Sequence, residues 1–382
     1  MDFESLFDIP IDDLHTPCYL TDARLLQKNT ALLKQIQQRT GCKILLAQKA
    51  FSMFSAYPLI RDDLAGTTAS GLFEAKLGRE HFGKEVHVFS PAYTQEDFTQ
   101  LLKLCDHIVF NSFGQWKKYR QQVQDATRNI SCGIRINPGY AEVETDLYNP
   151  CISGSRMGVP LEQMEDDFAG LDGIHFHTMC EQNSDVLERT LDHMLPQFDK
   201  WLKRCKWVNF GGGHHITRPD YDVERLVRCI ERVRDTYGVQ GYLEPGEAVA
   251  LNAGYLVATV LDVIHNGMDI AILDASAACH MPDVLEMPYR PHILYSGTAG
   301  EKAYTYRLAG NTCLAGDVIG DYSFDHQLQA GEKLVFCDMA IYSMVKNNTF
   351  NGVPLPDIAL YQDGQIQLVK RFGYIDFEGR LS

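Results

Sequence analysis

Eight short apolar segments alternate with segments of helical periodicity over the first two thirds of the chain, and this alternation restricts the fold more than any other feature. Helical patterns separate the apolar segments, for example over residues 185–204 and 220–237. Eight strand–helix repeats predict a (β/α)8 barrel of parallel strands. The predicted strands cover residues 43–48, 64–69, 85–90, 107–111, 131–136, 171–177, 206–210 and 240–244.

After about Gly254 the sequence changes character. Turn signals such as Asn266-Gly267 and Asp363-Gly364 replace the helical periodicity. The strand-like runs in this part cover residues 256–264, 270–274, 333–337 and 365–370. With 382 residues in all, we predict a barrel over residues 22–254 and a β-sandwich or barrel-like domain over residues 255–382, to which residues 1–21 contribute a strand.

Charge and cysteine content narrow the function classes. The formal net charge of -15 argues against nucleic acid or an anionic membrane as partner and suits a cationic substrate. The 11 cysteines are an odd number without a CxxC pair, which indicates free thiols in a reducing compartment and a cytoplasmic location. The acidic start has no leader pattern, and the longest apolar stretch, residues 253–264, contains Asp262 and is too short to span a bilayer.

Lys49 stands at the exit of the first predicted strand, after the apolar run Ile44-Leu45-Leu46-Ala47. Barrels of this type carry their chemistry at the carboxyl ends of the strands. Partial desolvation there lowers the pKa of an ammonium group, and the free amine can condense with a carbonyl compound. Taken alone, Lys49 is better explained as an ordinary solvated lysine, so a catalytic role depends on the other strand ends.

Histidines mark the end of the sixth predicted strand. Strand alternation puts His175 and His177 on one face, next to the barrel mouth. Three interpretations fit: a metal site completed by Cys180, His214 and His215, a His177 ring that packs flat on a planar cofactor, or a hydrogen-bonded pair of barrel histidines.

The seventh and eighth predicted strands end in an anion-binding pattern and a carboxylate. The run Gly211-Gly212-Gly213 lets backbone N–H groups converge on an anion, and barrels often bind phosphate after strands seven and eight. Glu244 ends the eighth strand, where a carboxylate can keep a pyridine nitrogen protonated; it can also pair with Arg135 on the fifth strand. Together with Lys49 and His177, these features predict pyridoxal phosphate as cofactor.

The chain resembles the fold-type III pyridoxal-phosphate enzymes, the family of alanine racemase and the ornithine, arginine and diaminopimelate decarboxylases. Within that family the sequence is most similar to the branch that decarboxylates carboxynorspermidine and carboxyspermidine. The phrases that carry the resemblance are Leu46-Ala47-Gln48-Lys49-Ala50-Phe51-Ser52, Phe176-His177-Thr178-Met179-Cys180-Glu181, Gly211-Gly212-Gly213-His214-His215, Glu244-Pro245-Gly246-Glu247-Ala248, Met281-Pro282-Asp283-Val284-Leu285-Glu286-Met287-Pro288-Tyr289-Arg290-Pro291 and Gly310-Asn311-Thr312-Cys313-Leu314-Ala315-Gly316-Asp317.

The resemblance implies roles for individual residues. Lys49 binds the cofactor covalently, His177 stacks on its ring, residues 211–213 hold its phosphate and Glu244 contacts its ring nitrogen, with Arg135 among the cofactor-binding residues. Cys313 reaches the site of the neighbouring subunit in a homodimer with shared active sites. Tyr342 contacts the phosphate.

Two departures from the wider family concern the substrate. Glu247 stands where the family has an arginine, and Leu314 follows the cysteine where ornithine-type enzymes have an aspartate. Both argue against ornithine. A longer cationic polyamine carboxylate needs acidic partners, and the candidates are Glu247, Asp283, Glu286 and Asp317.

Catalytic roles and rival functions follow from the same residues. The carbanion left by decarboxylation must be protonated, for which Cys313 is the first candidate and Lys49 the rival. Alternatives are another decarboxylase of the family, of the diaminopimelate or ornithine type, or a carrier of the cofactor without catalysis. A metal-dependent barrel hydrolase using His175, His177 and His214 leaves Lys49 and the glycine run unexplained, so we expect no resident metal in the active site.

Overall fold

A computed structural model describes residues 7–143 and 145–382 of the chain. Residues 1–6, the acidic start discussed above, lie outside the described residues. The chain divides into a barrel unit, Gln27–Val249, and a β unit made of Met1–Leu26 and Ala250–Ser382. The expected limits of 22 and 254 differ from these by five residues at each end. At the first division, helix α2 (Ala23–Thr40) begins directly after strand β1 (Cys18–Asp22) and contributes residues to both units.

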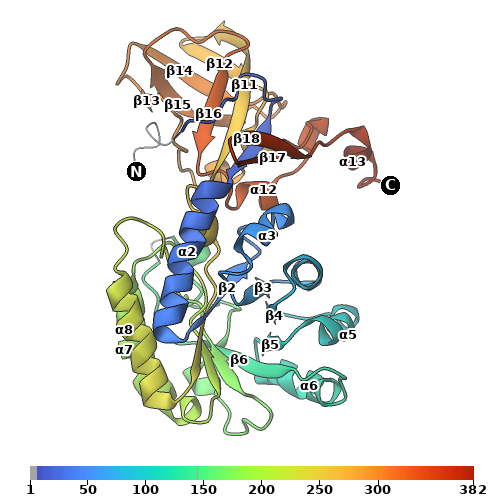
Figure 1. Ribbon diagram of the computed structural model, residues 1–382, viewed down its shortest axis with the longest axis vertical. Helices are drawn as coiled ribbons and strands as arrows, with labels where there is room; N and C mark the ends of the chain where they lie inside the picture. Colours follow the sequence, from blue (N-terminus) through green and yellow to red (C-terminus); the bar gives the residue numbers. More distant parts are fainter. Residues whose placement is uncertain (1–6, 144) are drawn as a thin grey trace. The chain divides into compact units, whose positions relative to one another are not determined.

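The barrel unit contains a closed sheet of eight parallel strands, which confirms the predicted (β/α)8 barrel (Figure 1). Strand β10 pairs with β2, and each of the other strands pairs in parallel with its neighbour around the barrel. The strands are β2 (Lys43–Ala47), β3 (Gly66–Ala69), β4 (Glu85–Phe89), β5 (His107–Phe110), β6 (Ser131–Asn137), β8 (Gly173–His175), β9 (Trp207–Asn209) and β10 (Gln240–Leu243).

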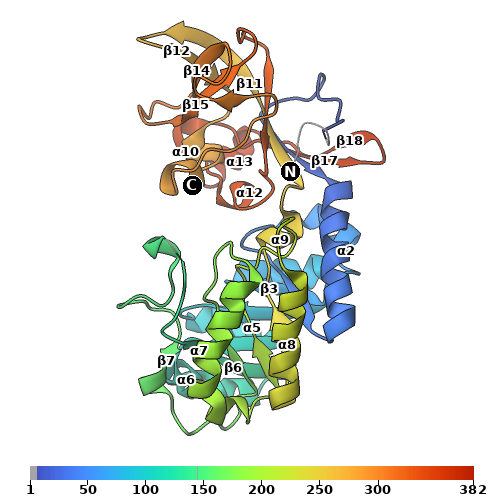
Figure 2. The same ribbon diagram turned by 90° about the vertical axis from the view of Figure 1, so that its left-hand side faces the viewer.

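Helices follow most of the barrel strands. Two of the longest, α7 (Ser184–Leu202) and α8 (Val223–Tyr237), lie side by side in both views (Figures 1 and 2). Helix α8 begins where the Asp222 side chain accepts the Arg225 N–H, and it ends at Gly238, whose φ of 69° suits glycine. The shorter elements are α3 (Tyr57–Ile60), α4 (Leu72–Leu77), α5 (Gln95–Leu104), α6 (Phe113–Gln124), α9 (Glu247–Ala250) and the two-residue strand β7 (Val159–Pro160).

In the β unit, the N-terminal strand β1 lies inside the sheet. It pairs antiparallel with β11 (Gly254–His265) and parallel with β17 (Asp357–Gln362). Buried side chains from β11, β12, β14, β15 and β16 form its largest core. The remaining elements are β12 (Asp269–Leu273), α10 (Ala277–His280), α11 (Asp283–Glu286), β13 (Gly297–Thr298), β14 (Tyr304–Ala309), β15 (Val318–Phe324), β16 (Lys333–Cys337), α12 (Ser343–Lys346), β18 (Gln365–Lys370) and α13 (Tyr374–Glu378).

No helix within residues 7–143 and 145–382 combines the length and the hydrophobicity needed to cross a bilayer.

Candidate active site

Lys49 lies just beyond the carboxyl end of β2, where neighbouring strand ends fix the backbone. The Gln48 N–H donates to the Thr68 carbonyl at 3.2 Å, and the Ala47 N–H donates to the Pro245 carbonyl at 3.1 Å. Desolvation lowers the pKa of the Lys49 ammonium, against the opposing attraction of Glu244. The side chain nevertheless remains accessible to solvent. Lys49 therefore presents an amine that deprotonates more readily than an ordinary lysine and can reach a ligand.

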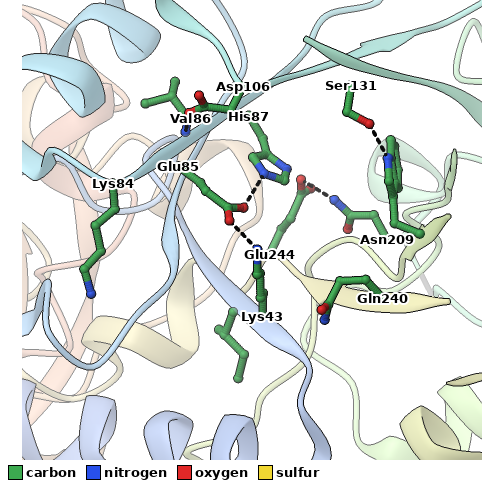
Figure 3. Close-up of polar contacts among 12 residues, drawn as sticks. Lys43, Lys84, Glu85, Val86, His87, Asp106, Ser131, Asn209, Gln240 and Glu244 are labelled. Atoms are coloured by element: carbon green, nitrogen blue, oxygen red, sulfur yellow. Dashed lines mark hydrogen bonds and ion pairs between the residues drawn. The ribbon is translucent and has the colours of Figure 1, made fainter. Parts of the chain in front are cut away.

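Glu244 follows β10, the strand next to β2, and both of its oxygens are hydrogen-bonded. One oxygen lies 3.1 Å from Nε2 of His175. The other accepts the Asn209 amide at 2.8 Å, as Figure 3 shows. Burial works to raise the pKa of Glu244, but His175 and Asn209 outweigh it and the pKa falls to about 2. Glu244 is therefore a carboxylate at neutral pH, able to accept a further N–H bond.

His175 supports that carboxylate. It is the last residue of β8, and desolvation lowers its pKa despite the attraction of Glu244. The neutral ring must carry its proton on Nε2 to donate to Glu244. Its Nδ1 is buried without a hydrogen-bond partner among the described residues.

His177 lies in the loop after β8 and is half-buried. Its Nδ1 accepts the Gly212 N–H at 2.7 Å. Desolvation holds the pKa of His177 well below its usual range. A neutral ring with an occupied Nδ1 carries its proton on Nε2, which suits a flat aromatic contact better than a charged contact.

The histidines do not form the metal site that a hydrolase requires. His175 bonds to Glu244, His177 bonds to Gly212, and Nε2 of His214 lies 3.3 Å from the Phe210 carbonyl oxygen. Two groups of three potential metal ligands occur among the described residues, and neither contains any of these three histidines. The hydrolase interpretation is therefore wrong about its ligand set.

The glycine run after β9 needs a correction. We expected three N–H groups to converge on an anion, but the Gly211 N–H donates to Oδ1 of Asn209 at 2.9 Å and the Gly212 N–H donates to His177. At most the Gly213 N–H remains for a phosphate. The glycines allow close packing instead: a Cβ on Gly211 would lie 2.5 Å from the Phe176 carbonyl oxygen, and Gly211 has a φ of 70°.

Arg135 is a buried cation on β6. It donates to the His177 carbonyl at 3.1 Å, and its guanidinium lies 4.6 Å from the centre of the Phe89 ring. Glu244 bonds to His175 and Asn209 instead of forming the expected ion pair with Arg135. Desolvation lowers the pKa of Arg135 to about 10, and its Nε has no hydrogen-bond partner among the described residues.

Sequence reasoning missed two acidic residues near these groups. Glu74 on α4 accepts the Ser70 N–H at 2.6 Å, and its charge acts on Lys49; desolvation raises the pKa of Glu74. Glu181 belongs to a cluster with His215 and Glu247, in which one polar atom of each side chain lies within 4.8 Å of the others. Within the cluster, Nε2 of His215 lies 2.9 Å from a carboxylate oxygen of Glu247. The positions of Glu74 after β3 and of Glu181 after β8 were the available signal.

Desolvation and the neighbouring Glu247 raise the pKa of Glu181. Desolvation works against protonation of His215, but Glu247 outweighs it and raises the pKa of His215. The backbone of Glu181 has a φ of 53°, a conformation that costs energy for a residue other than glycine. The cluster therefore concentrates negative charge beside one protonatable ring.

The remaining predicted residues lie in the β unit. Cys313 is exposed, and its N–H donates to Oδ1 of Asn351 at 2.8 Å. Tyr342 is half-buried and adopts a φ of 55° directly before α12. Both stay predictions as cofactor or catalytic contacts.

Asp317 is wrong as a substrate contact because its carboxylate is buried and occupied. One oxygen accepts the Ser276 hydroxyl at 2.8 Å and the Thr312 hydroxyl at 2.7 Å. The other oxygen accepts the Ala278 N–H at 3.1 Å. Asp317 thus ties the segment before Cys313 to the start of α10.

Asp283 and Glu286 already have a cationic partner. Lys346 of α12 forms ion pairs with both, at 2.7 Å for Glu286. Its hydrogen bond lowers the pKa of Glu286. A substrate ammonium group would have to compete with Lys346 for these two acids. Of the four acidic residues predicted to contact substrate, only Glu247 has neither a lysine nor a hydroxyl partner in the contacts described above; its partner is His215.

The barrel residues fit a pyridine-based aldehyde cofactor. Lys49 offers an accessible amine with a lowered pKa, and Glu244 offers an ionised acceptor for a ring N–H. Nδ1 of His175 and Nε of Arg135 are buried polar atoms without partners among the described residues, as expected where a polar ligand is to be held. Lys49, His177 and Glu244 would hold the cofactor.

Comparison with known proteins agrees with this site. Residues 18–340 match the family described as pyridoxal-dependent decarboxylase, C-terminal sheet domain. The chain belongs to this family of pyridoxal-dependent decarboxylases, whose cofactor is pyridoxal phosphate.

Two relatives are similar over nearly the whole chain. A carboxynorspermidine/carboxyspermidine decarboxylase of Campylobacter jejuni is 42% identical, over 97% of this chain and 99% of the relative. A carboxyaminopropylagmatine decarboxylase of Synechocystis is also 42% identical, over 97% of this chain and 96% of the relative. The crystal structure of carboxynorspermidine decarboxylase from Campylobacter jejuni, complexed with norspermidine, has a TM-score of 0.89 at 41% identity and covers 96% of this chain and 100% of that chain.

Proposed function

We propose that the protein decarboxylates carboxynorspermidine and carboxyspermidine in polyamine biosynthesis, with pyridoxal phosphate as cofactor. The observation that carries the chemistry is the pairing of Lys49 and Glu244 after neighbouring strands, an accessible amine of lowered pKa beside a carboxylate ionised at neutral pH. The substrate is supported by the relative of that name and by the related structure that binds norspermidine.

The residues of this chain divide the work. When bound, the cofactor supplies an electron-withdrawing ring that takes up the electron pair left by departing carbon dioxide. Nζ of Lys49, as an accessible amine of lowered pKa, would hold the cofactor through its aldehyde carbon. Glu244 keeps the ring N–H protonated, and the donors His175 and Asn209 keep Glu244 ionised. His177 packs on the ring as a neutral imidazole.

A proton must then reach the substrate carbon. We assign this step to Sγ of Cys313, with Nζ of Lys49 as the rival donor. Cys313 is exposed, and its N–H bond to Asn351 fixes the segment that carries it. A proton donor that must contact the substrate needs both properties.

Glu247 is our first candidate for the distal ammonium groups of the substrate. It lies in the cluster with Glu181 and His215, and a cation would offset the charge gathered there. Asp283 and Glu286 can contribute only by exchanging Lys346 for the substrate.

A substrate panel tests the proposal. The specificity constants for carboxynorspermidine and carboxyspermidine should exceed those for ornithine, lysine and meso-diaminopimelate by at least about 10³-fold, since a site built for distal cations leaves charges unpaired with shorter substrates. A preference for any of the three amino acids would refute the assignment.

Carboxyaminopropylagmatine is the second candidate substrate because the relative that acts on it is equally similar, at 42% identity. It ends in a guanidinium group, so adding it to the panel separates the two readings. The substrate with the higher specificity constant identifies the branch to which the enzyme belongs.

We also propose a homodimer with shared active sites. Lys49 belongs to the barrel unit, whereas Cys313 and Tyr342 belong to the β unit, and a two-fold dimer gives two identical composite sites. Lys49→Ala and Cys313→Ala homodimers should each be nearly inactive. Re-equilibrated mixtures should recover about a quarter of wild-type activity, since half the dimers are mixed and each holds one intact site. No recovery despite demonstrated subunit exchange would place each site within one chain.

A cytoplasmic location completes the proposal. The 11 cysteines are free, as in a reducing compartment. Fractionation of cells that express the tagged protein, with a periplasmic or secreted marker as control, tests it.

A further inference from the structure

Phe89 links the core inside the barrel to the candidate active site. It is the last residue of β4, so it lies at the carboxyl end of that strand, the end at which Lys49 and Glu244 follow β2 and β10. The half-buried ring packs against a cluster of buried side chains, formed by Leu45, Val109, Trp207 and Tyr242. The core thus holds the ring in place while part of it stays accessible.

The Phe89 ring lies against a buried cation. Its centre is 4.6 Å from Cζ of the Arg135 guanidinium. Arg135 on β6 is 4% exposed, and a charge removed from water needs a compensating partner. The guanidinium donates to the His177 carbonyl at 3.1 Å and contacts Sδ of Met157 at 4.0 Å, and neither group is charged. An aromatic face attracts a desolvated cation, so Phe89 supplies part of the compensation.

The charge of Arg135 stays available to a ligand. Its expected partner, Glu244, is occupied by His175 and Asn209, and Nε of Arg135 has no hydrogen-bond partner among the described residues. A carboxylate in the place of the Phe89 ring would neutralise the guanidinium, whereas an aromatic ring holds it and leaves its donors free. Arg135 can therefore meet a negatively charged group of the cofactor.

The same ring packs against His175. The ring centres of Phe89 and His175 are 5.5 Å apart, with 18° between their planes, which is an offset stack. His175 and Arg135 are register partners on β8 and β6, so both side chains leave the same face of the sheet. His175 bonds to Glu244 through Nε2, while its Nδ1 has no partner among the described residues. Since Nδ1 offers no second bond, the stack on Phe89 limits rotation of the imidazole.

We propose that Phe89 is a positioning residue for cofactor binding. Its ring holds the Arg135 guanidinium free for the cofactor and keeps the His175 imidazole in the plane from which it supports Glu244. The role rests on the proposed function and requires no contact between Phe89 and the substrate. A leucine would pack on the same core but offers no π face, so the position requires an aromatic ring and not only apolar bulk.

The test compares Phe89→Leu, which removes the ring face, with Phe89→Tyr, which keeps it. Equilibrium dialysis of the holoenzyme measures the dissociation constant of pyridoxal phosphate. This constant should rise about 10-fold or more in Phe89→Leu and stay within about threefold of the wild type in Phe89→Tyr. Phe89→Met, a second variant of similar bulk, carries the same expectation as Phe89→Leu if the latter does not fold.

Phe98→Leu is the matched control for the loss of a ring. Phe98 on α5 is fully buried, and its ring stacks on Tyr119 of α6 at 4.0 Å between centres. The substitution should lower Tm, as the loss of a buried ring does, and leave the dissociation constant of pyridoxal phosphate unchanged. Differential scanning calorimetry of all variants measures the change in Tm.

A pH profile separates positioning from a general loss of stability. Desolvation and, less strongly, the positive charge of Arg135 lower the pKa of the Lys49 ammonium. The groups that oppose them are Glu244, Glu74 and Cys180. In Phe89→Leu the released guanidinium repels the ammonium less, so the pH at which cofactor loading reaches half its plateau rate should rise. In Phe89→Tyr and Phe98→Leu it should not change.

An unchanged dissociation constant together with an unchanged loading profile in a folded Phe89→Leu or Phe89→Met variant overturns the role of Phe89. An equal loss of affinity in Phe89→Tyr also overturns it, because the ring face would then make no difference. A wild type that retains no pyridoxal phosphate would overturn the proposed function and the role of Phe89 together.

Discussion

Replacing Asp317 by asparagine separates a structural role from a substrate contact. The carboxylate is buried and accepts three hydrogen bonds, from Ser276, Thr312 and Ala278. Hydrogen bonds to a charged acceptor contribute about 1.5–3 kcal/mol each, against about 1 kcal/mol for neutral ones. Loss of the charge weakens all three, so we expect Asp317→Asn to lower the free energy of unfolding by about 2–4 kcal/mol.

For a unit of this size that loss corresponds to a Tm decrease of about 6–12 °C in the β unit. Asp321→Asn is the matched control: Asp321 lies on β15, the strand that begins directly after Asp317, and pairs with Arg307 at 2.8 Å on the surface, where a pair contributes about 0–1 kcal/mol. Differential scanning calorimetry of the holoenzyme gives both values, and steady-state kinetics below the transition gives KM. An unchanged Tm with a KM raised 10-fold or more would show that Asp317 faces the substrate after all.

Four further predictions concern residues of the barrel. In the wild type, borohydride should fix a covalent cofactor adduct on the Lys49 peptide, and Lys49→Ala should lose this adduct. A wild-type adduct mapped to another lysine would contradict the assignment. Glu244→Gln should keep the adduct but lose about 10²-fold or more in kcat. The rate of cofactor loading onto the apoenzyme should rise with pH and level off below pH 10.5, because only the neutral amine reacts and desolvation lowers the pKa of Lys49; a rate still rising above pH 10.5 contradicts this. Burial works to raise the pKa of Glu85, but His87 and Lys43 outweigh it. Glu85 therefore ionises at a lower pH in the folded protein than in the unfolded chain, with a pKa of about 2 against 4.5, so its stabilisation is complete above pH 4.5 and lost as the pH falls toward 2. The Tm difference between wild type and Glu85→Gln should therefore be full at pH 6 and reduced to about half at pH 3, and a difference that does not shrink refutes it.

The barrel was predictable because each of its strands can be recognised from the local sequence. Each is a short apolar run that ends in a turn or a capping residue, and β2, β4 and β10 each coincide with a predicted segment to within one residue. The β unit was harder. Strand β15 contains Gly320 and Asp321, and β14 alternates polar and apolar residues too briefly to stand out from loops. These two strands pair with each other, and β14 also pairs with β12, where Asp269 lies opposite Tyr306, so tertiary pairing rather than local pattern defines them.

The candidate site divides in the same way. Lys49 and Glu244 were predictable because position at a strand end suffices to place them. The bond of Asp317 to Ser276 joins residues that are 41 positions apart, and the ion pair of Asp283 with Lys346 joins residues that are 63 positions apart. Composition and periodicity do not reveal such contacts. The Gly211 and Gly212 N–H groups were wrongly predicted to bind an anion for a related reason. Asn209 and His177 accept these two N–H groups, so they are not available to an anion.

The place of β1 in the sheet makes the barrel an insertion within the β unit. The insertion leaves after β1 and returns at β11, and these strands are antiparallel neighbours, with Thr21 opposite Gly254. During synthesis, β1 emerges first yet must wait for β11 and, much later, β17 before both of its edges are paired. The barrel can fold in that interval, whereas the β unit is completed only near the end of translation. In a circular permutant, the two chain termini would be joined and the chain opened at the boundary between β1 and the barrel. Strand β1 would then follow β17 in sequence, and its pairing would no longer have to wait.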